Sequence, residues 1–504
     1  MSSTEETLSA DGAAPGAQEP SSTPEMCAVK EAVPAAPSPQ RATLAATGRA
    51  STQDRVSVHD QQQQQQQQQQ PPPVKLVRQK DGQWALARDG RLINNLSRAV
   101  GFMELANAGD FAANVWNDVP VPVYAVVFMA IGGTVAGFLS IFAFRDAKRA
   151  CCNVRYLRRQ RLLLLEDKRR LAARCASTLE TDIILAINFR ELGTELVTRW
   201  IMDLLMGFGA ILISVGTYMA IGGANPSVFL ASNLLSGYVG NTPIALFGLC
   251  NSSWAAFIFT KAQRHISASR RLLGACTATA LVKRRARKVQ VFSVINGTAT
   301  ILGGVGSMIT ATRWWGYVIL LPVIISSVFC NVWWRRMIGY TRSEGHPAMV
   351  RDELIYALEF AAASEVKSLE DPEAPPAWCA ELPSSLGDML HFLTRHSLIH
   401  QFCADVIANP HICQALGGNA TDQAELSVSP ESLLALPADL QQILLDHANR
   451  MAREVGPDHF KNRERYLAEI LGTYCTMALR HGIMDDTDSA ERREKNTEKI
   501  VEAI

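Results

Sequence analysis

Apolar residues are concentrated in five runs along the middle of the chain, and charged residues separate most of these runs. The first run, VPVYAVVFMAIGGTVAGFLSIFAF, carries no charge and is long enough to cross a hydrocarbon core of about 30 Å. The pattern predicts five membrane spans, at about 121–144, 200–222, 243–260, 289–312 and 314–334. The third run is short, so an alternative with four spans makes it re-entrant.

The motif TATRWWGY, residues 310–317, separates the last two runs. A single helix through both runs would be roughly 70 Å long at about 1.5 Å per residue, more than twice the thickness of the hydrocarbon core. Arg313 and Gly316 suit a turn, and the rings of Trp314, Trp315 and Tyr317 suit the headgroup level. We therefore predict two spans joined by a tight loop.

Polar segments flank the predicted spans. Residues 1–75 are rich in Ala, Pro, Ser and Gln, and they end in a run of glutamines followed by prolines. This composition buries too little apolar surface to offset the entropy of ordering, so we expect a disordered low-complexity tail. Residues 76–120 are expected to form an amphipathic pre-membrane segment. Within it, residues 97–119 form either an interfacial helix or an ordinary linker helix. The interfacial helix would place four large residues at the membrane surface: Phe102, Leu105, Phe111 and Trp116.

The last part of the chain, residues 337–504, has the pattern of a soluble domain of four to six helices. Residues 342–504 carry 14 Lys/Arg and 27 Asp/Glu, so this domain is strongly acidic. The predicted fold class is therefore all-α: a polytopic membrane helix bundle of about five spans, with a disordered N-terminal tail and a soluble C-terminal helical domain.

Basic residues are concentrated in two segments between the runs. Residues 145–174 hold eleven Lys/Arg and three Asp/Glu, and residues 261–288 hold nine Lys/Arg and no acid. The positive-inside rule makes 145–198 and 261–288 inner loops. With five spans, the C-terminal domain is then cytosolic, and the N-terminus lies on the opposite side, where the sequon at Asn95 could be glycosylated. The acidic first residues favour a eukaryotic endomembrane or plasma membrane over a mitochondrial one.

Three interpretations of the basic segments remain open. They enforce topology, they bind anionic headgroups in addition to the lipid bilayer itself, or they dock the acidic C-terminal domain. For headgroup binding the candidate residues are Arg158, Arg159, Arg161, Arg284, Arg285 and Arg287.

Small residues recur inside the predicted spans, where they allow helix backbones to approach closely. The candidates for helix packing are Gly133, Gly137, Gly303, Gly304 and Ser307. Contacts in a homo-oligomer, or the lining of a pore, are the alternatives. Only one acidic residue lies within a predicted span, Asp203, which we expect to pair with Arg199. The scarcity of ionisable residues counts against an ion-coupled transporter but not against a passive pore.

A cluster of His and Cys residues occurs in the C-terminal domain. His396, His400 and Cys403 would share one face of a helix, and these side chains suit zinc. The same face is apolar, so core packing is the simpler interpretation and we predict no metal and no cofactor. The common nucleotide-binding, hydrolase and zinc-protease motifs are absent, and no basic patch is interleaved with aromatic residues as nucleic-acid binding would need.

These observations leave three hypotheses about function. The leading one is a non-enzymatic membrane scaffold or adaptor, whose inner helical domain binds protein partners. The first alternative is a passive channel or lipid transporter. The second alternative is a membrane enzyme that acts on a lipid, for which His396 and His400 are the residues to test.

Overall fold

The computed structural model describes most of the chain after residue 72. The described residues are 73–79, 83–86, 91–116, 120–343, 346–347, 349–370, 382–418 and 424–482. The low-complexity tail predicted for residues 1–75 therefore lies outside the described residues, except at its end. There Val74 and Lys75 begin a β-strand, so the predicted boundary is slightly too late.

Among the described residues, five helical stretches are long and apolar enough to cross a membrane, as predicted: Val123–Ala173, Leu179–Ala220, Pro226–Leu273, Thr277–Thr310 and Gly316–Ile338. The predicted fold class is thereby confirmed. The third stretch continues far beyond the short apolar run at 243–260. Large apolar side chains on these helices face outward, as lipid contact requires; on the last stretch they include Val318, Leu321 and Ile325.

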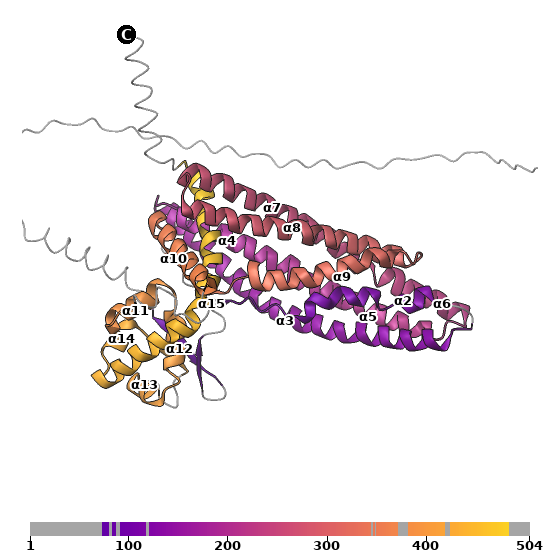
Figure 1. The fold of residues 1–504 in the computed structure, drawn as a ribbon, viewed down its shortest axis with the longest axis horizontal. Helices are drawn as coiled ribbons and strands as arrows, with labels where there is room; N and C mark the ends of the chain where they lie inside the picture. Colours follow the sequence, from indigo (N-terminus) through magenta and orange to yellow (C-terminus); the bar gives the residue numbers. More distant parts are fainter. Residues whose placement is uncertain are drawn as a thin grey trace, which may run out of the picture. The chain divides into compact units, whose positions relative to one another are not determined.

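The helices of the bundle pack in pairs (Figure 1). α7 (Thr242–Leu273) and α8 (Thr277–Thr310) lie side by side over their length, and α3 (Val123–Ala173) packs against α5 (Met202–Ala220). α9 (Gly316–Trp333) packs against α8.

The connection between α8 and α9 is the tight turn predicted from TATRWWGY. The backbone N–H of Arg313 donates to the carbonyl of Ile309, and that of Gly316 donates to the carbonyl of Arg313. Trp314 and Trp315 are exposed, as expected for headgroup contact, whereas Tyr317 is half-buried. The residues from 223 to 242, expected to be an outer loop, instead contain α6 (Pro226–Asn233) and a π-helical turn (Leu234–Val239) packed on α5. A proline at the first helical position starts α6 behind the N-cap Asn225, whose side chain accepts from Ser227.

The two basic segments are helical rather than loops. α3 continues past its apolar run to Ala173, and α4 (Leu179–Glu195) returns beside it and joins α5 through a π-helical turn (Leu196–Ile201). α7 and α8 likewise extend past their apolar runs. We call this the basic extension: the four helix portions 145–173, 179–198, 261–273 and 277–288.

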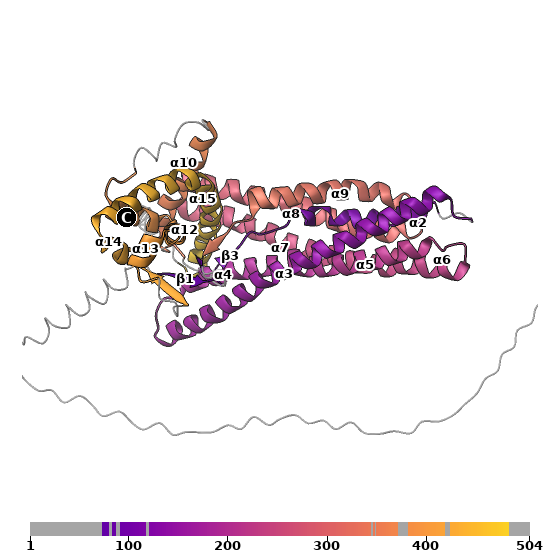
Figure 2. The same ribbon diagram turned by 90° about the horizontal axis from the view of Figure 1, so that it is seen from below.

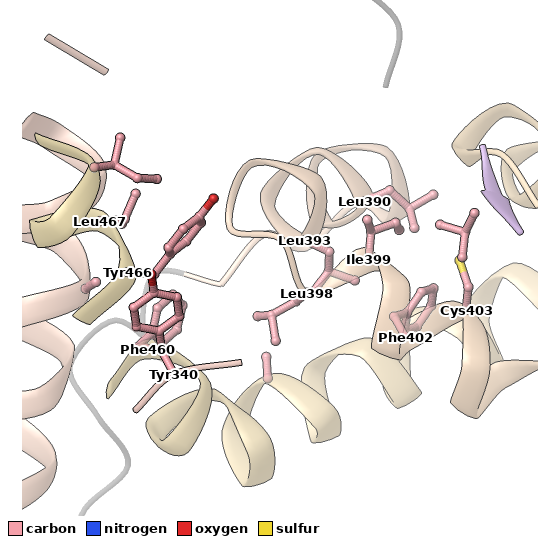
Figure 3. Packing of buried hydrophobic residues seen from close by; sticks show 14 of the residues in the cluster. Tyr340, Leu390, Leu393, Leu398, Ile399, Phe402, Cys403, Phe460, Tyr466 and Leu467 are labelled. Carbon is pink, nitrogen blue, oxygen red and sulfur yellow. The ribbon is translucent and has the colours of Figure 1, made fainter. Parts of the chain in front are cut away.

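The C-terminal domain is built around two long helices. These are α10 (Arg351–Glu370) and α15 (Ala438–Arg480), which pack against each other. Between them lie α11 (Leu386–Arg395), α12 (Ile399–Val406), α13 (Pro410–Ala415) and α14 (Pro430–Leu434). Leu390, Leu393, Ile399, Phe402 and Phe460 lie in the buried core (Figure 3).

The acidic domain docks on the basic extension, as one of the three interpretations predicted. α15 contacts α4, α7 and α8. Glu464 forms an ion pair with Arg284 at 3.1 Å, and Glu469 forms one with Lys261 at 3.2 Å. Burial alone would raise the pKa of Glu469, but Arg190 and Lys261 hold it well below its ordinary value.

Two small antiparallel sheets join the start of the described chain to its end. β1 (Val74–Arg78) pairs with β2 (Trp84–Leu86) and with β5 (Glu425–Val428) of the C-terminal domain. β3 (Arg91–Leu92) pairs with β4 (Arg342–Ser343), directly after the last span. The strands β1, β2 and β3 therefore lie on the same side as the C-terminal domain. The expectation from an odd number of spans, which placed the two on opposite sides, is wrong for these residues.

Candidate functional site in the helix bundle

The segment from Ser97 to Trp116 runs along the bundle. It explains why the strands that precede it lie on the same side as the C-terminal domain. The carbonyl of Ser97 accepts from Asn331 near the end of α9, whereas Asn114 bonds the Tyr317 hydroxyl at the start of α9. On α3, the N–H of Ser97 donates to Asp146, and the ring of Trp116 contacts that of Tyr124. These contacts on α3 are separated by about 33 Å at about 1.5 Å per residue. The segment thus passes the whole apolar thickness of the bundle (Figure 1 and Figure 2).

This crossing segment is a 3₁₀ helix followed by a short α-helix. η2 (Ala99–Ala108) and α2 (Phe111–Val115) form it, where an interfacial helix and an ordinary linker helix were the two alternatives; residues 117–119 of that range lie outside the described residues. A 3₁₀ helix has three residues per turn, so residues three apart share a face. Phe102 and Leu105 are exposed on one such face, as predicted, while Glu104, Asn107 and Asp110 share another face and are buried.

Glycines let the crossing segment approach its neighbours closely. A Cβ built at Gly132 of α3 would lie 2.0 Å from the carbonyl oxygen of Gly109, and one built at Gly101 would lie 2.9 Å from the side chain of Asn331. Real Cβ contacts are never this short, so both positions require glycine for the observed packing. The segment is therefore an integral part of the bundle rather than a helix on its surface.

Glu104 is the central ionisable group of the segment. It is 4% exposed, and its Oε2 accepts a hydrogen bond from Asn107 Nδ2 at 2.5 Å. Among the described residues, no Lys, Arg or His forms an ion pair with it. Gly303 of α8 leaves room beside the carboxylate, since a Cβ there would lie 3.7 Å from Oε2. Glu104 thus lies between apolar runs without a basic partner.

A cavity of about 80 Å³ lies next to Glu104, between η2, α5, α7, α8 and α9. Polar side chains that line it are Glu104, Thr198, Arg199, Asn251, Asn296, Thr300, Ser327 and Asn331. Asn251 donates to Thr300 at 3.1 Å, but its buried Oδ1 accepts no hydrogen bond within the described part of the chain. The Oδ1 of Asn107 is buried and unpaired in the same way. The cavity has room for several waters or a small solute, and it presents mainly oxygen atoms.

A buried charge network closes the cavity on the side of the basic extension. Arg199 lines the cavity and forms ion pairs with Glu195 at 2.7 Å and Asp146 at 3.4 Å. Its guanidinium also donates to Asn95 at 2.9 Å, at the entrance to the crossing segment. The expected pair of Arg199 with Asp203 does not form, because Asp146 of α3 and Glu195 of α4 take both ends of the guanidinium. Asp203 is nevertheless fully buried nearby.

A second polar cluster lies at the other end of the crossing segment. The Tyr317 hydroxyl donates to Asp110 at 2.9 Å and accepts from Asn114 at 2.8 Å. Asp110 is 0% exposed. Glu104 and Asp110 are therefore both buried inside the bundle.

The small residues chosen for helix packing lie at helix contacts. Gly133 accepts from Ser214 of α5 at 2.7 Å, and a Cβ at Gly137 would lie 3.3 Å from the same hydroxyl. Gly303 faces α9, Gly304 faces Ala245 of α7, and the carbonyl of Ser307 accepts from Asn241. The structure thus distributes these five residues over three different helix pairs within one chain.

The six arginines proposed for anionic lipid contact fall into two groups. Arg158, Arg159 and Arg287 are exposed. The other three contact groups of the chain itself: Arg161 lies over the Phe189 ring, Arg284 pairs with Glu464, and buried Arg285 donates to the carbonyls of Met337 and Ile338.

The three residues considered for a metal are not brought together on one helix. The helix expected over 384–408 is broken, because α11 ends at Arg395 and Ser397 takes a left-handed conformation at φ 59°. His396 stacks on Phe360, with ring centroids 4.3 Å apart, and Cys403 lies in the core. His400 lines a separate cavity. Within the described ranges, no three His, Cys, Asp or Glu side chains gather in a way that could hold a metal ion.

Comparison of the chain with protein-family models, with curated proteins and with solved structures found no match.

Sequence reasoning missed Glu104 because residues 97–116 are too polar to be counted as a span. One signal was present. Glu104, Asn107 and Asp110 recur every third residue, out of phase with Phe102, Leu105 and Ala108. A period of three rather than 3.6 predicts a 3₁₀ helix with one polar face.

Proposed function

We propose that this protein is a multi-pass membrane protein that conducts protons or a small monovalent cation through the cavity beside Glu104. The observation that carries this proposal is the buried carboxylate of Glu104, which lies at the depth of the apolar runs and has no basic partner in the described part of the chain. An unpaired carboxylate in an apolar environment is expected to bind a proton or a cation, because an isolated charge is costly there.

The chemistry around the cavity supports a monovalent ion. The carboxylate of Glu104 and several amide and hydroxyl oxygens line the cavity, and the one guanidinium that also lines it, that of Arg199, is already paired with Asp146 and Glu195. A divalent ion usually takes more carboxylates.

The test is ion flux in proteoliposomes that contain the full-length protein. We expect flux of H⁺, Na⁺ or K⁺ above that of protein-free liposomes, and a loss of at least about tenfold in Glu104→Gln, which keeps the shape of the side chain. Glu166→Gln is the matched control, since that carboxylate is exposed on the basic extension. If none of the three ions moves, or if Glu104→Gln conducts like the unaltered protein, the proposal is wrong.

An adaptor function is the alternative, and docking of the C-terminal domain bears on it. Glu464 and Glu469 bind the basic extension of the same chain, so these acids are not available to a partner. An adaptor would retain its partner binding in Glu104→Gln, whereas a transporter would lose its flux. The enzyme hypothesis has less support, because His396 is stacked in the core, apart from the cavity that His400 lines.

A further inference from the structure

A second cavity, of about 410 Å³, lies in the C-terminal domain, away from the membrane-spanning helices. It is formed where three parts of the chain meet: Leu86 and Arg91, residues 341–343 with Pro347 after the last span, and α12 with α15. Its volume is within the range of sites that bind small organic molecules. The polar side chains most relevant to binding are Arg91, Ser397, His400, His459, Asn462 and Arg463.

The charges around this cavity are unbalanced. No acidic side chain is among the described residues that line it. Arg342 also lines it, but this guanidinium is already paired with Glu191 of α4. Arg91 and Arg463 form no ion pair in the described part of the chain, and the Nε atoms of both are buried without a hydrogen-bond acceptor.

Arg463 is the more deeply buried of the two, at 7% exposure. Its Nη2 donates to the carbonyl of Arg395 at 2.8 Å, and its Nη1 donates to the Ser397 hydroxyl. Two neutral oxygens thus position the guanidinium, but no carboxylate balances its charge. Burial lowers the pKa of Arg463 to about 10, which still leaves it charged at neutral pH. A buried charge without a counter-ion is unfavourable, so an anion from solution would stabilise this arrangement.

The two histidines contribute hydrogen bonds rather than charge. Burial lowers the pKa of His459 to about 4 and also lowers the pKa of His400, so both are neutral at pH 7. His459 Nε2 donates to the carbonyl of His396 at 2.8 Å, and the buried Nδ1 of His400 has no partner in the described residues. Asn462 is held by the backbone of Thr341. Its Oδ1 accepts from the Thr341 N–H, and its Nδ2 donates to the Thr341 carbonyl.

We infer that this cavity binds a phosphate group, either inorganic or carried by an organic molecule. Two guanidinium groups without counter-charge match the two negative charges of a phosphate, and the planar guanidinium fork suits its oxygens. The bound phosphate would join β3 to α12 and α15, and so would tie the entrance of the crossing segment to the C-terminal domain.

The experiment is titration calorimetry on the full-length protein in detergent at constant ionic strength. The soluble probes are inorganic phosphate, pyrophosphate and ATP. For phosphate on a lipid, protein in nanodiscs of phosphatidylcholine alone is compared with protein in nanodiscs that also contain phosphatidic acid. We expect at least one probe to bind, and its affinity to fall about tenfold or more in Arg463→Gln and in Arg91→Gln. Tighter retention of phosphatidic acid than phosphatidylcholine, with the same dependence on both arginines, would identify a lipid as the source.

Arg453→Gln is the matched control, because Arg453 lies on the same helix but is exposed and outside the cavity. If Arg463→Gln does not fold, Arg91→Gln and His400→Gln still test the site, since Arg91 belongs to β3 and His400 to α12 rather than to α15. Absence of binding by every probe, or equal binding by Arg91→Gln and the unaltered protein, would overturn the inference.

Discussion

Two segments cross the apolar thickness of this bundle in contrasting ways. On α9, large apolar side chains cover the outer face, with Val318, Leu321 and Ile325 each more than 60% exposed. On the crossing segment, only Phe102 and Leu105 are exposed among the residues of η2, and Glu104 is buried. A helix that faces lipid must be apolar, whereas a segment enclosed by other helices needs only small residues and internal hydrogen bonds. Hydropathy therefore finds the first kind and misses the second.

The difference between these two segments predicts on which side of the membrane each part of the chain lies. We predict that the crossing segment makes a sixth passage through the membrane, so protease sites inserted between β1 and β2 and at the C-terminus should be cut from the same side of sealed microsomes. A site inserted at Gly223, at the opposite end of the bundle, should be cut only from the other side. From the positive-inside rule we predict that this shared side is the cytosolic one. We also expect Asn95 to remain unglycosylated.

Cutting of the first two sites from opposite sides would restore the five-passage arrangement. It would also be incompatible with the pairing of β1 and β5.

The largest loss of stability is expected at the entrance of the crossing segment. Arg199→Met leaves Asp146 and Glu195 buried without their cation, which should cost about 3–5 kcal/mol of unfolding free energy. Arg170→Met removes a cation from an exposed pair with Glu166 and should cost less than about 1 kcal/mol. Denaturant titration in detergent measures both. Similar losses in the two variants would show that the buried network does not anchor the segment.

A smaller loss is expected from a single methyl group between the crossing segment and α3. In Gly132→Ala the new Cβ would lie 2.0 Å from the Gly109 carbonyl oxygen, so one backbone must move. Overpacking of this kind costs about 1–3 kcal/mol. Gly222→Ala is the control, because its Cβ would meet ordinary contacts at 3.4 Å. Thermal unfolding should separate the two variants, and an unchanged midpoint for Gly132→Ala would argue against close packing here.

The smallest effect is expected at the far end of the segment. Tyr317→Phe removes the hydrogen bonds to Asp110 and Asn114 and should cost about 1 kcal/mol. The control is Tyr238→Phe, whose ring is 39% exposed and which should be nearly neutral. Equal thermal midpoints for the two variants would mean that Tyr317 acts at the headgroup level, as its position beside Trp314 and Trp315 first suggested.

The sequence by itself determined the five apolar helices and the turn at TATRWWGY, and it offered the docking of the acidic domain on the basic segments as one of three interpretations. Each of these depends on a local property: length of an apolar run, turn residues, or charge sign. The sequence also contained the period of three at Glu104, Asn107 and Asp110. The segment is too polar for its hydropathy to indicate a helix inside the bundle.

Only the tertiary structure decided where the polar segments lie. Residues 97–116 enter the bundle because Gly109 fits against Gly132 and because Asn331, Tyr317 and Asp146 supply partners from distant parts of the chain. Likewise, Arg91 and Arg463 are 372 positions apart and meet at one cavity only through the pairing of β3 with β4. The burial of a polar group depends on neighbours that are remote in sequence, and for that physical reason local patterns could not reveal either site.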